Sequence, residues 1–145
     1  MNAKLTWIKD RCPYWLAAAV LATGLAAVAA PVRAGDTTAA HQLERFNAQA
    51  GTAGQAERGR VFFTSRHGGE WSCASCHGNP PTSAGKHAST GKSIEALAPA
   101  FNPQAFTDTA KVDKWFRRNC KDVAQRECTP TEKADVLAYL LSLMR

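Results

Sequence analysis

Apolar residues recur at helical spacing in four segments of the chain. Spacings of three, four and seven residues place side chains on one face of a helix, which can then pack on a core. The pattern predicts helices over about 37–50, 55–64, 109–120 and 130–144. The apolar positions are Leu43, Phe46 and Ala50; Phe62 and Phe63; Val112, Trp115 and Phe116; and Ala134, Leu137 and Leu141. No segment alternates strongly enough to predict a sheet, so we expect an all-α fold of about four helices.

Residues that favour helix starts precede three of these segments. Asp36 or Thr37 is the expected cap of the first helix, and Thr107 or Asp108 that of the third. The run Thr129-Pro130-Thr131-Glu132 combines a capping box with proline at the first helical position. It predicts that the last helix begins there.

The beginning of the chain has the features of an export signal. An apolar run at 15–30 follows three basic residues, Lys4, Lys9 and Arg11, and precedes Val32-Arg33-Ala34. Small residues at the two ends of that tripeptide suit a signal peptidase, so we expect cleavage after Ala34. The alternative is an uncleaved anchor, but the run is shorter than the roughly 20 residues of a membrane span. The sequence predicts a signal peptide at 1–34, one domain at 35–145, a periplasmic location and no stable membrane insertion after cleavage.

The net charge of the chain indicates no particular class of partner. Four of the 18 basic residues and one of the 12 acidic residues lie in 1–34, so the net charge falls from +6 to +3 in the mature segment. No basic run with interleaved aromatic residues appears, and we therefore expect no nucleic-acid partner.

The segment Cys73-Ala74-Ser75-Cys76-His77 is a C-x-x-C-H motif, the attachment signature of c-type haem. Two thiols add to the haem vinyl groups, and the histidine that follows supplies the proximal iron ligand. A thioredoxin-like redox pair would need a preceding strand, and a zinc site would need a second close pair of cysteines. Neither is evident, so the expected cofactor is one covalently attached haem c. The proline- and glycine-rich segment 78–103 then reads as a loop that wraps the haem.

Two further cysteines, Cys120 and Cys128, remain in the mature segment. In an oxidising compartment such a pair persists as a disulfide, and we expect this bridge. Two buried free thiols are the alternative.

The second axial ligand decides the function. Met144, the penultimate residue, is poorly placed to act as the methionine ligand of an electron carrier. His87 lies in the wrapping loop, and bis-histidine ligation through it is one alternative. His41, His67, Tyr139, the lysines or an empty position are weaker ones. Asn119 falls on the apolar face of the third helix, although asparagine also caps helix ends. Its amide oxygen, a hard and weak ligand, would hold ferric iron better than ferrous iron.

Beyond the haem motif, several stretches resemble the SHP-type cytochromes c, small class I cytochromes that bind oxygen. The stretches that carry this resemblance are residues 91–99, 106–108, 114–115, 118–120 and 128–135. The resemblance spans about 56–141. It implies that Asn119 is the sixth ligand of the oxidised haem and leaves on reduction. It also implies the Cys120–Cys128 disulfide, and a diheme cytochrome c and a membrane cytochrome b as redox partners.

We therefore expect a class I cytochrome c fold around one haem, with Cys73, Cys76 and His77 as its attachment residues. The expected function is electron transfer and binding of O2, NO or CO at ferrous haem. No titratable group is placed as a general acid, with His87, Arg117 and Arg118 only candidates, so dedicated catalysis is not expected. The alternatives are a plain electron carrier and an enzyme that consumes O2 or NO.

Overall fold

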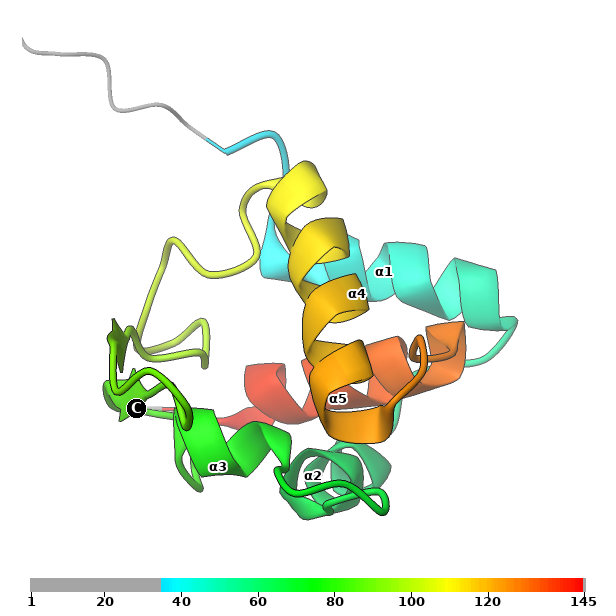
Figure 1. Ribbon diagram of the computed structural model, residues 1–145. Helices are drawn as coiled ribbons and strands as arrows, with labels where there is room; N and C mark the ends of the chain where they lie inside the picture. The colour runs from blue at the N-terminus through cyan, green and yellow to red at the C-terminus, as the bar shows by residue number, and fades with distance from the viewer. Residues whose placement is uncertain (1–34, 145) are drawn as a thin grey trace, which may run out of the picture. The chain divides into compact units, whose positions relative to one another are not determined.

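The computed structural model describes residues 35–144, and its helices form a small bundle (Figure 1). The elements in chain order are α1 (Ala39–Ala50), α2 (Ala56–Thr64), α3 (Cys73–His77), β1 (Gly85–Lys86), β2 (Ser93–Ile94), α4 (Thr109–Ala124) and α5 (Pro130–Ser142). The predicted signal peptide lies outside the described residues and stays a prediction. None of the helices within 35–144 combines the length and apolar character that a membrane span requires.

Helix α5 is the centre of the fold, since α1 and α2 both pack against it. One core cluster joins α1, α4 and α5 through residues such as Phe46, Val112 and Leu137. A second cluster joins α2 and α5 through Phe63, Tyr139 and Leu140, and α3 packs on it with Cys73 and Ala74. The attachment motif is therefore fixed directly against the core.

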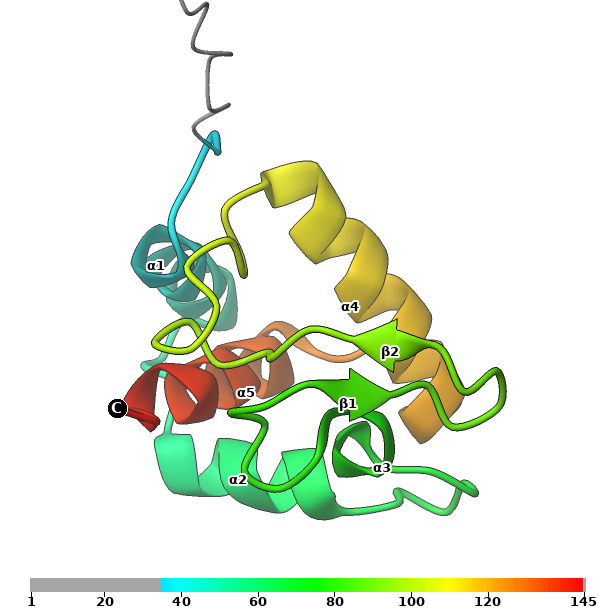
Figure 2. The same ribbon diagram turned by 90° about the vertical axis from the view of Figure 1, so that its left-hand side faces the viewer.

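The all-α prediction is confirmed, and all four predicted helices are present. The third helix runs to Ala124 rather than Cys120, and it ends where Gln125 adopts a left-handed conformation with φ 56°. Two short elements were not predicted. One is α3 itself; the other is an antiparallel hairpin that pairs Gly85 with Ile94 and Lys86 with Ser93, visible at the front of Figure 2.

The helix starts confirm two of the three predicted caps. The Asp108 side chain accepts from the Lys111 N–H at 2.9 Å, and Thr129 forms the expected capping box with Glu132. The cap predicted for α1 is wrong, because Thr38 accepts from the His41 N–H at 3.2 Å. Asp36 instead accepts from the Thr109 N–H at 2.9 Å and links the segment before α1 to α4.

The predicted inner face of α4 is only partly correct. Val112 is buried, while Phe116 and Asn119 are half-buried. Trp115, which was expected to point toward the core, is 47% exposed. It lies at the margin of the apolar face, next to exposed basic residues of the same helix.

Candidate haem site

Helix α3 gathers both thiols and the imidazole of the predicted attachment motif in five residues. Ser72 caps it, because its Oγ accepts from the Ser75 N–H at 3.2 Å while the Ser75 Oγ accepts from the Ser72 N–H at 3.0 Å. Cys73 and Cys76 are free thiols three positions apart, so they lie on one side of the turn. The local sequence thus builds the turn that presents two sulfur atoms together.

His77, the last residue of α3, is held against the core. Its ring centroid lies 6.3 Å from that of buried Phe63, which in turn lies 5.6 Å from that of Tyr139. Burial lowers the pKa of His77 and so favours the neutral imidazole, the form that binds metals. Its Nδ1 atom is buried and has no hydrogen-bond partner within residues 35–144.

The two thiols have different surroundings. As long as Cys73 is not joined to haem, burial raises the pKa of its thiol to about 11. The Cys76 sulfur accepts a hydrogen bond from the Ala88 N–H at 3.3 Å. A Cβ at Gly85 would overlap the carbonyl oxygen of Cys76, so β1 lies directly on the end of α3. The hairpin therefore covers the Cys76 side of the motif.

These residues fit a haem c. Two free thiols on one turn meet the requirement for two thioether bonds, and a half-buried imidazole with an unpaired buried Nδ1 follows immediately. Within the described residues, no group of three or more His, Cys, Asp or Glu side chains is arranged to hold a metal ion. The donor set of α3 is therefore suited to an iron carried by a porphyrin rather than to a bare ion.

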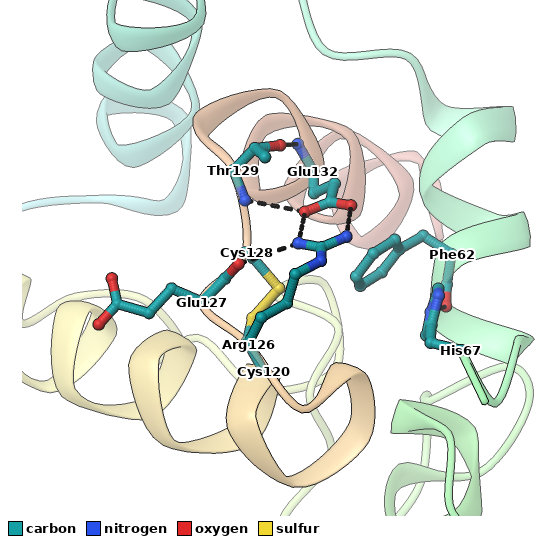
Figure 3. The surroundings of a disulfide bond; sticks show 8 residues. All are labelled: Phe62, His67, Cys120, Arg126, Glu127, Cys128, Thr129 and Glu132. Atoms are coloured by element: carbon teal, nitrogen blue, oxygen red, sulfur yellow. Dashed lines mark hydrogen bonds and ion pairs between the residues drawn. A yellow bond between two sulfur atoms is a disulfide. The ribbon is translucent and has the colours of Figure 1, made fainter. Parts of the chain in front are cut away.

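Asn119 lies on α4, and Figures 1 and 2 both show α3 next to the C-terminal half of that helix. The Asn119 side chain is half-buried, and no hydrogen bond holds its amide within residues 35–144. The next residue, Cys120, is joined to Cys128 by a disulfide with a Cα–Cα distance of 5.6 Å. Figure 3 shows this disulfide beside the start of α5. The end of α4 that carries Asn119 is thereby tied to the central helix.

Two of the other candidate ligands are engaged elsewhere. The Nδ1 atom of His87 accepts from the Thr90 N–H at 3.3 Å inside the hairpin turn, on the Cys76 side of the motif. His67 forms a hydrogen bond of 2.8 Å between its Nε2 and the Phe62 carbonyl oxygen, and its ring lies on that of Phe62.

The remaining candidates are no better placed. Met144 is 77% exposed near the chain end, and His41 is exposed on α1. The Tyr139 hydroxyl donates to the Asn79 side chain at 3.4 Å. The Asn119 side chain, by contrast, is half-buried and its amide has no hydrogen bond within residues 35–144.

Comparisons with known proteins agree with this site. A family described as a domain of unknown function, DUF1924, matches residues 49–140. Cytochrome c-type protein SHP of Cereibacter sphaeroides is 48% identical over 119 residues, which cover 79% of this chain and 92% of SHP. Cytochrome c'' of Methylophilus methylotrophus is 44% identical over 88 residues, 58% of this chain and 61% of that protein.

Solved structures give the same result. Oxidized SHP, described as an oxygen binding cytochrome c, matches with a TM-score of 0.71 and 47% identity over 75% of this chain and 100% of that chain. Oxidized cytochrome c'' from Methylophilus methylotrophus matches with a TM-score of 0.64 and 36% identity over 74% and 95%. The chain belongs to the SHP-type cytochromes c. Its cofactor is one covalently attached haem c.

For this SHP-type cytochrome, the sequence predicted Cys73, Cys76 and His77 as attachment residues but did not predict the elements that position them. Ser72 and Ser75 form a capping box at the start of α3. It has serine at the position where the box at Thr129 has glutamate. Gly85 lies in the segment 78–103 that is predicted to be a loop. In the structure, its missing side chain lets the hairpin reach the Cys76 backbone. A pairing of only two residues per strand leaves no periodic pattern that could have predicted it.

Proposed function

We propose that this protein is an exported monohaem c-type cytochrome that carries electrons and binds diatomic gases (O2, NO, CO) in its reduced state. Haem iron, when bound, supplies a one-electron redox change and a coordination position for a gas. The relative that matches over its whole length is described as an oxygen binding cytochrome c. This description and the attachment residues on α3 support the proposal.

The proposal assigns the second axial position in the oxidised state to Asn119. The observation that carries it is a half-buried amide, on the helix next to α3, with no hydrogen bond within residues 35–144. An amide oxygen is a hard donor, and it loses more affinity than imidazole does when iron becomes ferrous. Asn119 would therefore leave the iron on reduction, and the freed position would be open to a gas. A structure of cytochrome c'', a relative, is described in terms of haem-ligand detachment.

The chain's own residues have separate tasks in this cycle. Cys73 and Cys76 fix the cofactor to α3, and His77 keeps its neutral imidazole as the permanent ligand, held against Phe63. The Cys120–Cys128 disulfide holds the end of α4 near the position to which Asn119 returns on oxidation. The family resemblance suggests a diheme cytochrome c and a membrane cytochrome b in the periplasm as redox partners. A plain electron carrier and a gas-consuming enzyme are the alternatives.

Absorption spectra of the holoprotein test the ligand assignment. The ferrous protein should be high-spin and shift fully with carbon monoxide, because Asn119 has left. Asn119→Ala should change the ferric spectrum and leave the ferrous spectrum as it is, since the amide is bound only in the ferric state.

His87→Ala, a change in the rival ligand, is the matched control and should alter neither spectrum. A low-spin ferrous spectrum that does not respond to carbon monoxide would reveal a strong second ligand such as His87. The gas-binding proposal would then fail, and the protein would be a plain electron carrier.

A further inference from the structure

The outer side of α4 carries a concentration of positive charge. Five basic residues are exposed along about three turns of this helix: Lys111, Lys114, Arg117, Arg118 and Lys121, which together we call the basic face. They extend over roughly 15 Å at the 1.5 Å rise of an α-helix. In Figures 1 and 2, α4 lies at the edge of the bundle.

This one helix accounts for the whole net charge of the predicted mature segment. Residues 35–145 contain 14 basic and 11 acidic residues, of which α4 holds five basic and two acidic. The rest of the segment therefore has nine of each sign and no net charge. A surface whose excess charge lies on one face has a strong dipole, which orients the molecule toward an oppositely charged partner.

The positive charges of the basic face are largely uncompensated. Among the five, only Lys111 has an ion pair within residues 35–144, with Asp108 at 3.6 Å and at an exposed position. Of the two acidic residues of α4, Asp113 is already paired with Arg45 of α1 at 2.6 Å. The positive electrostatic potential of the basic face therefore extends into the solvent.

The basic face also borders the side of α4 that carries Asn119. Lys114 Nζ lies 5.4 Å and Arg118 Cζ 5.8 Å from the ring centroid of Trp115, which is 47% exposed. Trp115 is four residues before Asn119 and hence on the same side of the helix. A partner that binds the basic face would lie close to the position proposed for the haem ligand.

We propose that the basic face of α4 is the docking surface for an acidic redox protein. This inference rests on the proposed function, because a cytochrome that exchanges electrons needs a protein with which to exchange them. Five exposed cations along one helix, two of them beside the exposed Trp115 ring, suit a cluster of carboxylates on a partner. Complementary charge of this kind mainly raises the rate of association and selects the orientation of docking.

Other anionic surfaces fit less well. A helix that binds a membrane surface buries an apolar face in the lipid, whereas the apolar face of α4 packs on the protein core through Val112, Phe116 and Val123. Nucleic acid would favour a basic surface with several stacking aromatics, and Trp115 is the one aromatic residue exposed on α4.

The test is the rate at which reduced flavodoxin, an acidic one-electron donor, reduces the ferric holoprotein in stopped flow. In each event one electron leaves the flavin and the ferric haem takes it up. The variant K114Q/R117Q/K121Q removes three charges from the basic face and spares Arg118, the neighbour of Asn119. The matched control R66Q/K86Q/K92Q removes three exposed charges from other elements and thus gives the same net charge.

The bimolecular rate should fall about tenfold in the α4 variant at low ionic strength and by less than about twofold in the control. The difference should disappear near 0.5 M salt, where screening is strong. Reduction by a small neutral hydroquinone should be the same in all three proteins. Equal losses in both variants, or a larger loss in the control, would overturn the docking site.

Two further probes separate this inference from its rivals. Vesicles of phosphatidylglycerol and a duplex DNA oligonucleotide should bind the α4 variant and the control equally. Loss of binding to either probe in the α4 variant alone, with the flavodoxin rate unchanged, would reassign the basic face to that partner. Carbon monoxide spectra of the same proteins report on the proposed function independently. Normal spectra with an unchanged flavodoxin rate would overturn the docking inference alone.

Discussion

Gly59 lies where α2 crosses α5. A Cβ at this position would overlap the backbone carbonyl of Asp135 and approach the Cβ of Tyr139. The absence of a side chain at Gly59 thus permits the close approach of α2 to α5. Close approach in turn lets Arg58 donate two hydrogen bonds of 2.8 Å to the buried Asp135 carboxylate.

Gly59→Ala should therefore destabilise the protein, by about 1–3 kcal/mol as for other overpacked positions. The direction is diagnostic, because the same substitution inside an unobstructed helix stabilises by roughly 1 kcal/mol through helix propensity. Urea unfolding of the holoprotein, followed by far-UV circular dichroism, measures the change. A gain in stability would contradict the close crossing of α2 and α5.

At the scale of an element, the start of α5 depends on Glu132. Its carboxylate accepts from the Thr129 N–H at 2.8 Å and from the Arg126 guanidinium at 2.6 and 2.8 Å, as Figure 3 shows. The Arg126 guanidinium, with a smaller contribution from Thr129, holds the pKa of Glu132 below its ordinary value. The ionised side chain thus stabilises the first turn of the central helix.

This lowered pKa predicts a dependence of stability on pH. The unfolded chain regains the ordinary Glu pKa of about 4.3, so it takes up the proton first as pH falls. The contribution of Glu132 is therefore complete above that value and is lost as pH falls through the lowered folded pKa. Glu132→Gln should flatten the curve of unfolding free energy against pH in this acidic range. Glu127→Gln, at an exposed neighbour with no side-chain partner in the described chain, should leave the curve unchanged.

Most of the long elements could be predicted from sequence because their signals are local. The capping box at Thr129 and the apolar stripes of α1, α2 and α5 are complete within a few residues of chain. The errors have tertiary causes. Thr38 replaces Asp36 as a cap because Asp36 bonds to α4, and Trp115 lies at the margin of the core although its spacing matches that of Val112 and Phe116.

Cys73, Cys76 and His77 could be proposed as attachment residues from sequence, because C-x-x-C-H is contiguous, and they stay a prediction. What could not be predicted is which hydrogen bonds the rival candidate ligands make. His87 is engaged by Thr90, and His67 by Phe62. These bonds depend on a turn and on a side-chain stack that no spacing in the sequence indicates, so the sequence left the histidines open as alternatives to Asn119.

At the scale of the whole molecule, α4 packs less extensively on the rest of the bundle than the other long helices do. It meets the rest of the bundle through a few apolar side chains such as Val112 and Phe116, through the Arg45–Asp113 pair and through the Cys120–Cys128 disulfide. The disulfide closes the short segment between α4 and α5. It therefore restricts how far the helix that carries Asn119 can move away from α5.

Removal of this bridge with Cys120→Ala and Cys128→Ala together should lower the free energy of unfolding by about 2–3 kcal/mol, the chain-entropy value for so short a loop. Hydrogen exchange should rise mainly in α4, since the other helices keep their contacts with α5. Dithiothreitol should reproduce the effect in the wild-type protein and do nothing to the double variant. Equal exchange across all helices would show that α4 is not selectively held by the bridge.

The hairpin over the end of α3 constrains the order in which the protein matures. Gly85 rests on the Cys76 carbonyl, and the Ala88 N–H is bonded to the Cys76 sulfur. Haem attached to this sulfur would take the place of the thiol hydrogen beside the Ala88 N–H. We therefore expect attachment to precede the final closure of the hairpin during maturation.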